Sequence, residues 1–229
     1  MTYRRLLMIT MALAMAVLTA GCGDKSTDES ANNGNPPPVW AFTCGDEHVL
    51  ALLDDNGALL VAADGVRRLD HLESASGALY AGPADTLWNK GDEGKLTRAG
   101  GPAGDCRTSG RQRVLADAWR SGVIFLAAGN EPSWNLRATA DNLVLLTPGN
   151  PPLELSLASP LRPGTTHIVA GNGNIELQVR LGPGPWLDTM SGEPFPLSAD
   201  VTVGERHLHG GCLYFPPPGM GRIRAATQE

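Results

Sequence analysis

The chain carries one stretch that decides its fold class, His48-Val-Leu-Ala-Leu-Leu-Asp-Asp-Asn-Gly-Ala-Leu-Leu-Val-Ala-Ala-Asp-Gly-Val-Arg-Arg-Leu-Asp70. Short apolar runs alternate here with two turn signals, Asp54-Asp55-Asn56-Gly57 and Asp64-Gly65. Runs of this length between such turns are typical of antiparallel strands joined as hairpins. The strands predicted from this stretch are 48–53, 58–62 and 66–72.

The same pattern continues on both sides of that stretch and predicts an all-β module over residues 39–108. The further strands expected in it are 39–43, 78–80, 86–88 and 95–98. Strands about ten residues apart favour a small antiparallel barrel or sandwich. Val114, Leu115, Ala118 and Trp119 then fall at helical spacing, which predicts a short helix in a linker over residues 109–121.

A second all-β module, again a small antiparallel barrel or sandwich, is expected over residues 122–215, followed by a loosely ordered tail over 216–229. Turn signals punctuate the module, and we read both Gly171-Asn172-Gly173-Asn174 and Gly182-Pro183-Gly184-Pro185 as turns. The strands expected are 123–128, 134–138, 143–147, 153–157, 167–170, 175–180, 197–203 and 206–210.

The first 22 residues form a targeting segment. Arg4 and Arg5 precede the apolar run Leu6–Leu18, which is shorter than the roughly 20 residues of a membrane-spanning helix. Thr19-Ala20-Gly21-Cys22 resembles a bacterial lipobox, which implies that Cys22 becomes a lipidated N-terminus that anchors the protein to a membrane, with the outer membrane facing the periplasm as the expected location. The alternative is an ordinary secretory signal that leaves a free thiol. Residues 23–38 read as a disordered tether.

The charge balance argues against a nucleic-acid partner. The chain has 18 basic and 24 acidic residues, and removal of residues 1–22 deletes two basic ones, so the mature charge is 16 − 24 = −8. Binding to phosphates needs basic patches, whereas opposite net charge speeds encounter with a cationic partner.

The remaining cysteines suggest one structural bridge in the first module. Cys44 lies near its start and Cys106 near its end, so a disulfide would join the two ends, and the periplasm is a compartment where such bonds persist. Cys212 is left over, and we expect it to be buried and free, the alternative being a reactive thiol.

The first module resembles a known family. The segments Ser76-Gly77-Ala78-Leu79-Tyr80 and Trp88-x-Lys90-Gly91, within the cysteine frame, are similar to the membrane-bound lysozyme inhibitor of C-type lysozyme family. The resemblance implies an eight-stranded antiparallel barrel that enters the lysozyme cleft. It assigns binding to Ser76, Tyr80 and Lys90, with Ser74 and Gly77 supporting the same loop, and it implies neither catalysis nor a cofactor.

The chemistry of these residues suits such a target. The cleft of a C-type lysozyme holds one protonated and one ionised carboxyl group, and a serine hydroxyl can donate to one and accept from the other while a lysine supplies charge. The alternative is a plain loop, with Tyr80 filling the core and Lys90 a solvated turn charge. We interpret Lys95 as a surface charge.

The second module resembles uncharacterised bacterial envelope lipoprotein domains. The matching motifs are Gly129-Asn130-Glu131-Pro132-x-Trp134, Asp188-x-Met190-Ser191-Gly192-Glu193-x-Phe195-Pro196 and Gly211-Cys212. That family commonly has a cysteine just before the second motif, and Pro185-Trp186-Leu187 stands there instead. The motifs favour capped turns over a binding site.

The other reactive side chains of this module do not favour a functional site. A metal at His207, His209 and Cys212, or a triad built from Asp188 and Ser191, is not favoured, so no metal site is expected. The alternative function for the whole chain is a structural or ligand-binding envelope lipoprotein that acts through the second module.

Overall fold

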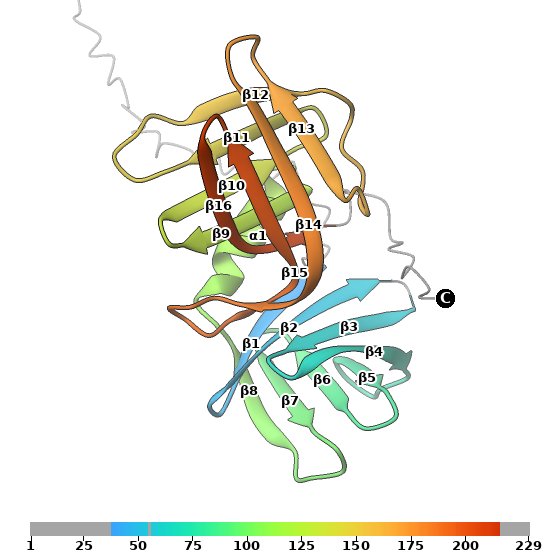
Figure 1. The fold of residues 1–229 in the computed structure, drawn as a ribbon. Coiled ribbons are helices and arrows are strands. Elements are labelled where there is room, and N and C mark those ends of the chain that lie inside the picture. Colours follow the sequence, from blue (N-terminus) through green and yellow to red (C-terminus); the bar gives the residue numbers. More distant parts are fainter. Residues whose placement is uncertain (1–37, 55, 216–229) are drawn as a thin grey trace, which may run out of the picture. The chain divides into compact units, whose positions relative to one another are not determined.

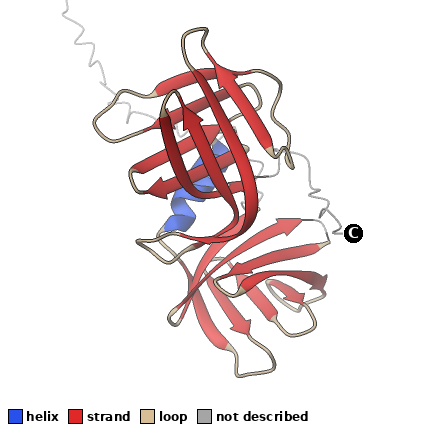
Figure 2. Cartoon of the chain, in the orientation of Figure 1, coloured by secondary structure: helices blue, strands red, loops and turns tan. Residues whose placement is uncertain are grey.

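The structure is a computed structural model that describes residues 38–54 and 56–215. The expected signal peptide with Cys22, the tether apart from its last residue, and the tail over 216–229 lie outside the described residues. Within the described part, the all-β prediction with one short helix is confirmed (Figures 1 and 2). No helix in this part is long and apolar enough to cross a membrane.

The first eight strands close into an antiparallel barrel in which each strand pairs with its sequence neighbours, and β1 pairs with β8. Strand β8 was not predicted, because one buried residue, Cys106, is its only core contribution. The strands are β1 (Val39–Cys44), β2 (Glu47–Asp54), β3 (Gly57–Ala62), β4 (Gly65–Leu72), β5 (Ala78–Ala81), β6 (Thr86–Lys90), β7 (Glu93–Thr97) and β8 (Gly104–Thr108).

Strands β1 to β3 are buried on both faces, which explains their continuous apolar runs. In β1, Trp40 and Phe42 belong to the cluster inside the barrel, whereas Val39 and Ala41 belong to a second cluster. Since successive side chains of a strand point to opposite faces, the second cluster covers the outer face of the barrel wall. A strand with one solvated face would alternate apolar and polar residues instead, as β7 does.

Helix α1 (Arg111–Arg120) follows β8, and it is the predicted helix with a slightly later start. Its buried residues are Leu115, Ala116, Ala118 and Trp119. Gln112 accepts a hydrogen bond from Ala41 N at 2.7 Å and donates one to Val39 O at 3.1 Å. The side chain thus satisfies the backbone of β1 beyond the last residue that pairs with β8.

The second eight strands also close into an antiparallel barrel, with β9 between β10 and β16. Each of the eight expected strands is present. Their bounds are β9 (Phe125–Asn130), β10 (Ser133–Ala138), β11 (Asn142–Leu146), β12 (Leu153–Leu157), β13 (His167–Gly171), β14 (Glu176–Leu187), β15 (Pro194–Val203) and β16 (Arg206–Tyr214).

One turn prediction in this barrel is wrong. Gly182-Pro183-Gly184-Pro185 lies inside the long strand β14 and not in a turn. Strand β13 pairs with β14 only as far as Arg180, so the two prolines lie where β14 has β15 as its one partner, and the pairing shifts register between Pro183 and Trp186. Proline is tolerated at such edges and bulges because no ladder hydrogen bond is lost.

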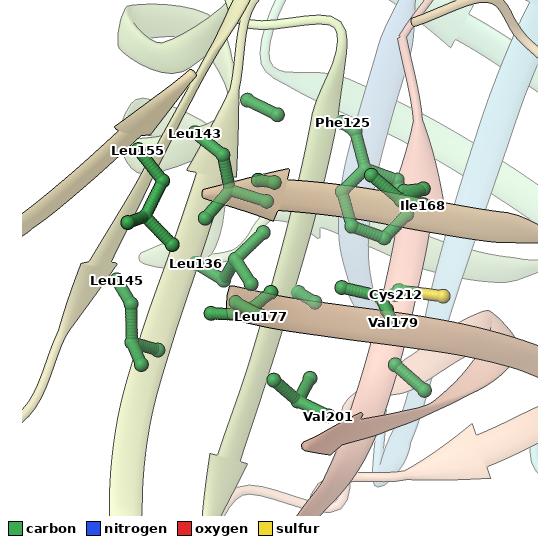
Figure 3. Close-up of a cluster of buried hydrophobic side chains, with 14 of the residues drawn as sticks. Phe125, Leu136, Leu143, Leu145, Leu155, Ile168, Leu177, Val179, Val201 and Cys212 are labelled. Atoms are coloured by element: carbon green, nitrogen blue, oxygen red, sulfur yellow. The ribbon is translucent and has the colours of Figure 1, made fainter. Parts of the chain in front are cut away.

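The second barrel has a closely packed apolar interior. Figure 3 shows leucine, valine and isoleucine side chains of this interior together with Phe125 and the sulfur of Cys212. Cys212 is a free, fully buried cysteine, as expected.

The cluster outside the first barrel is shared with the rest of the chain. It joins residues of β1, β2 and β3 to the buried face of α1 and to Leu126, Phe195, Leu213 and Phe215 of the second barrel. The expected module boundaries at 108/109 and 121/122 are therefore both crossed by apolar packing.

Candidate functional site

The connection between β4 and β5 presents the predicted serine loop. Residues 73–77 are all exposed. Ser74 Oγ donates a hydrogen bond to Ser76 O at 2.8 Å, and Trp88 Nε1 of strand β6 donates one to the same oxygen at 2.9 Å. Within the described residues the hydroxyl of Ser76 has no hydrogen-bond partner. The two serines thus differ, because Ser74 bonds within the loop and the Ser76 hydroxyl is available to another molecule.

Gly77 brings this loop directly against strand β6. Its φ of +71° lies in the left-handed region that side chains rarely adopt. A Cβ built on Gly77 would lie 2.4 Å from Asn89 O, 3.1 Å from Trp88 Nε1 and 3.1 Å from Lys90 Cβ. The predicted supporting role of Gly77 thus has a physical basis, since only glycine allows this approach.

Lys90 therefore lies beside the serine loop. It is the exposed last residue of β6, followed by the turn residue Gly91 at φ +57°. Lys90 makes no ion pair with any described residue, whereas Lys95 binds Asp105 at 2.9 Å. That hydrogen bond raises the pKa of Lys95 and lowers the pKa of Asp105. The structure brings Ser74, Ser76, Gly77 and Lys90 together and leaves Lys95 as a paired surface charge.

Tyr80 lies in the interior of the barrel and differs in this from the other four predicted site residues. It is 6% exposed and belongs to the core cluster, with its ring 5.4 Å from that of His71 on the neighbouring strand. Burial raises the pKa of Tyr80, and the Asp54 charge adds to the effect. Its predicted role in binding stays a prediction.

The Cys44–Cys106 disulfide is present and connects the first and last strands of the barrel. The two cysteines are direct register partners on β1 and β8. The bridge therefore seals the seam at which the barrel closes.

An ion network that no sequence pattern indicated connects three loops and two strands of the first barrel. Asp85 is 4% exposed and receives Arg98 Nη1 at 2.8 Å and Arg67 Nε at 3.1 Å. Arg98 also binds Glu47 at 2.6 Å and Asp64 at 2.8 Å. The Arg67 hydrogen bond, with help from Arg98, lowers the pKa of Asp64 to about 2. The network has every charge paired, which indicates a structural role.

The motifs of the second barrel form capped turns and packing contacts. Asp188 Oδ1 accepts hydrogen bonds from Met190 N and Ser191 N, and Gly192 has φ +71°. These bonds, opposed by partial burial, leave the pKa of Asp188 lowered. Trp134 Nε1 donates to His209 O at 3.3 Å.

The second of these motifs also contacts the linker that follows β8. Ser109 Oγ donates to Glu193 Oε1 at 2.9 Å, and the Arg111 guanidinium lies 3.8 Å above the Phe195 ring and donates to Pro194 O. Burial lowers the pKa of Arg111 to about 10, opposed by the charges of Glu193 and Asp188. Beside these contacts is a groove of about 350 Å³ lined by Val114, Leu126, Asn135, Asp188, Glu193 and Phe195 among others.

The histidine and cysteine candidates of β16 do not form a site. His209 Nδ1 lies 2.7 Å from Asp200, and His207 contacts Thr202. Burial raises the pKa of the Cys212 thiol, which makes the thiolate scarce and the residue unreactive. Among the described residues no group of three or more histidine, cysteine or acidic side chains could hold a metal ion.

The first barrel, which carries the serine loop, Lys90 and the seam disulfide, contains the part of the chain that matches a family model. Residues 42–103 match the family model of the membrane-bound lysozyme-inhibitor of c-type lysozyme. This match covers most of the first barrel and supports a lysozyme-inhibitor role. No curated protein and no solved structure matches the chain. The match concerns residues of the first barrel alone, and the resemblance proposed for the second barrel is not shown.

Proposed function

We propose that the protein is an envelope lipoprotein that inhibits a C-type lysozyme by inserting the Ser76 loop and Lys90 into the cleft of the enzyme. The proposal is carried by a serine hydroxyl and a lysine on adjoining segments of one barrel, neither of which has a partner among the described residues. Residues 42–103 match a lysozyme-inhibitor family, which supports the choice of target.

The chemistry of the cleft explains how these two groups would block it. A C-type lysozyme needs one protonated carboxyl as acid and one ionised carboxylate. The Ser76 hydroxyl can bond to both, and the Lys90 ammonium neutralises the ionised one. Each charge-assisted hydrogen bond in a desolvated cleft contributes about 1.5–3 kcal/mol. The occupied cleft then has no room for substrate.

The other assigned residues support this contact. Gly77 allows the loop to reach β6, Ser74 fixes the loop from within, and Tyr80 anchors the strand that follows the loop in the barrel core. Lipidation of Cys22 would hold the barrel at the membrane, on our proposal the outer membrane facing the periplasm, where incoming lysozyme arrives. The expected mature charge of −8 would attract a cationic enzyme.

The test is lysis of bacterial cell walls, followed as loss of turbidity, with the mature chain and a panel of C-type lysozymes. The variant Ser76→Ala with Lys90→Ala should weaken inhibition by roughly 100-fold or more, since two such bonds are lost. Lys95→Ala is the matched control, because it removes a lysine already paired with Asp105. A chain that inhibits no C-type lysozyme at micromolar concentration would refute the proposal.

A second candidate function is ligand binding by the second barrel. The groove beside α1 favours it, because apolar side chains there lie next to the polar groups of Asn135, Asp188 and Glu193. This candidate predicts that the chain leaves lysozyme activity unchanged in the same assay.

A further inference from the structure

The carbonyl oxygen of Ser76 is the point at which the serine loop is fastened to the barrel. It accepts hydrogen bonds from the Trp88 indole at 2.9 Å and from the Ser74 hydroxyl at 2.8 Å. No other hydrogen bond holds Ser74, Ala75 or Ser76 to the described part of the chain. An exposed loop with so few attachments would otherwise sample many conformations.

Trp88 is placed to couple the two groups that face the enzyme. Trp88 and Lys90 are two residues apart on β6, so their side chains share its outer face, while Leu87 and Asn89 point into the barrel. The loop lies on this same segment, because the space beside Gly77 is bounded by Trp88 Nε1, Asn89 O and Lys90 Cβ. The half-buried side chain of Trp88 thus contacts the loop that carries Ser76. Trp88 also belongs to the strand that carries Lys90.

We propose that Trp88 is a positioning residue for inhibition, whose indole N–H fixes the Ser76 peptide so that the Ser76 hydroxyl and Lys90 are presented with a constant separation. The inference rests on the proposed function for its consequence, and on the two hydrogen bonds to Ser76 O for its geometry. Preorganisation of this kind raises affinity because the ordering of the loop no longer has to occur on binding.

The central variant is Trp88→Phe, which deletes the N–H and keeps an aromatic ring. Inhibition should weaken by about 3- to 10-fold, which corresponds to the net contribution of one hydrogen bond. Ser74→Ala removes the other donor from an exposed position, so it tests the same attachment without a change in the core. The double variant should lose more than either single variant.

Trp134→Phe is the matched control. It deletes an indole bond to a backbone carbonyl, Trp134 Nε1 to His209 O, in the second barrel. If general destabilisation explained the effect of Trp88→Phe, the Trp134→Phe chain would lose inhibition to the same degree. The positioning role predicts unchanged inhibition for this control.

A double-mutant cycle separates positioning from direct contact. In the Ser76→Ala background the hydroxyl is already absent, so Trp88→Phe should have little further effect on inhibition. Additive losses would overturn the inference, because they would mean that Trp88 acts independently of Ser76.

A measurement without lysozyme keeps the inference testable if the proposed function fails. Backbone NMR order parameters of Ala75, Ser76 and Gly77 should be about 0.85 in the unaltered chain and fall below about 0.6 in the Trp88→Phe, Ser74→Ala variant. Unchanged order parameters would refute the positioning role. Absence of inhibition by the unaltered chain, with reduced order parameters in the variant, would refute only the choice of target.

Discussion

Replacement of Gly77 by alanine is the sharpest perturbation of the serine loop. The new Cβ would lie 2.4 Å from the backbone oxygen of Asn89, and backbone atoms of a paired strand cannot move aside as a flexible side chain can. The loop therefore has to lift away from β6. Lifting breaks the bond between Trp88 and Ser76 and separates Ser76 from Lys90.

The expected loss of stability in Gly77→Ala follows from two contributions. A non-glycine residue in the left-handed region costs about 1–2 kcal/mol, and loss of the indole hydrogen bond adds about 1 kcal/mol. The total of about 2–3 kcal/mol corresponds to a fall in melting temperature of roughly 4–12 °C for a chain of this size. Inhibition should fall by roughly tenfold or more, because the Ser76 hydroxyl no longer lies beside Lys90.

Gly100→Ala is the matched control for this prediction. Gly100 has φ +74°, close to the +71° of Gly77, and a Cβ built there meets nothing within 4 Å. Thermal unfolding and the turbidity assay are run on both variants. Together they separate the effect of backbone strain from that of the clash between the new Cβ and Asn89 O. Equal melting temperatures together with equal inhibition in the two variants would refute the reasoning.

Two further predictions concern the stability of the first barrel. Cys44→Ser with Cys106→Ser opens a 62-residue loop and should lower the free energy of unfolding by about 4 kcal/mol, and an unchanged urea midpoint would contradict this. The pKa of Asp64 is lowered to about 2, so its contribution to stability is present above about pH 4 and is lost as the pH falls toward 2. Stability measured from pH 5 to pH 2 should therefore fall less steeply in Asp64→Asn than in the unaltered chain, and identical slopes would count against the ion network.

Local signals made much of the fold predictable. The turns at Asp54–Gly57 and Asp64-Gly65 are encoded in adjacent residues, and the strands that they connect lie within two residues of the expected bounds. Strand β8 escaped prediction because its pairing with β1 joins residues far apart in sequence, and its own residues are mostly polar. The prolines of β14 gave a false turn signal, since sequence does not reveal which part of a strand lacks a second partner.

Part of the candidate site was also predictable, because some of its signals lie in adjacent residues. The composition of residues 74–77 indicated an exposed loop, and the distinction between Lys90 and Lys95 agrees with the observed ion pair of Lys95. The burial of Tyr80 depends on the register between β4 and β5, which residue types alone do not specify. The hydrogen bond between Trp88 and Ser76 spans 12 positions and depends on the pairing of β5 with β6, so no local pattern indicated it.

The disulfide at the barrel seam also determines how the protein responds to mechanical load. A pull on the chain ahead of Val39 acts first on β1, whose hydrogen bonds to β2 would break one after another from that end. At Cys44 the disulfide adds a second covalent path, which passes part of the force to β8 through Cys106. If the chain is held through its N-terminus, as we propose, an enzyme bound at Ser76 and Lys90 pulls from inside the 62-residue loop that the disulfide closes, so the segments on both sides of the site share the load. Neither β2, which follows Cys44, nor β8, which carries Cys106, then bears the whole pull alone.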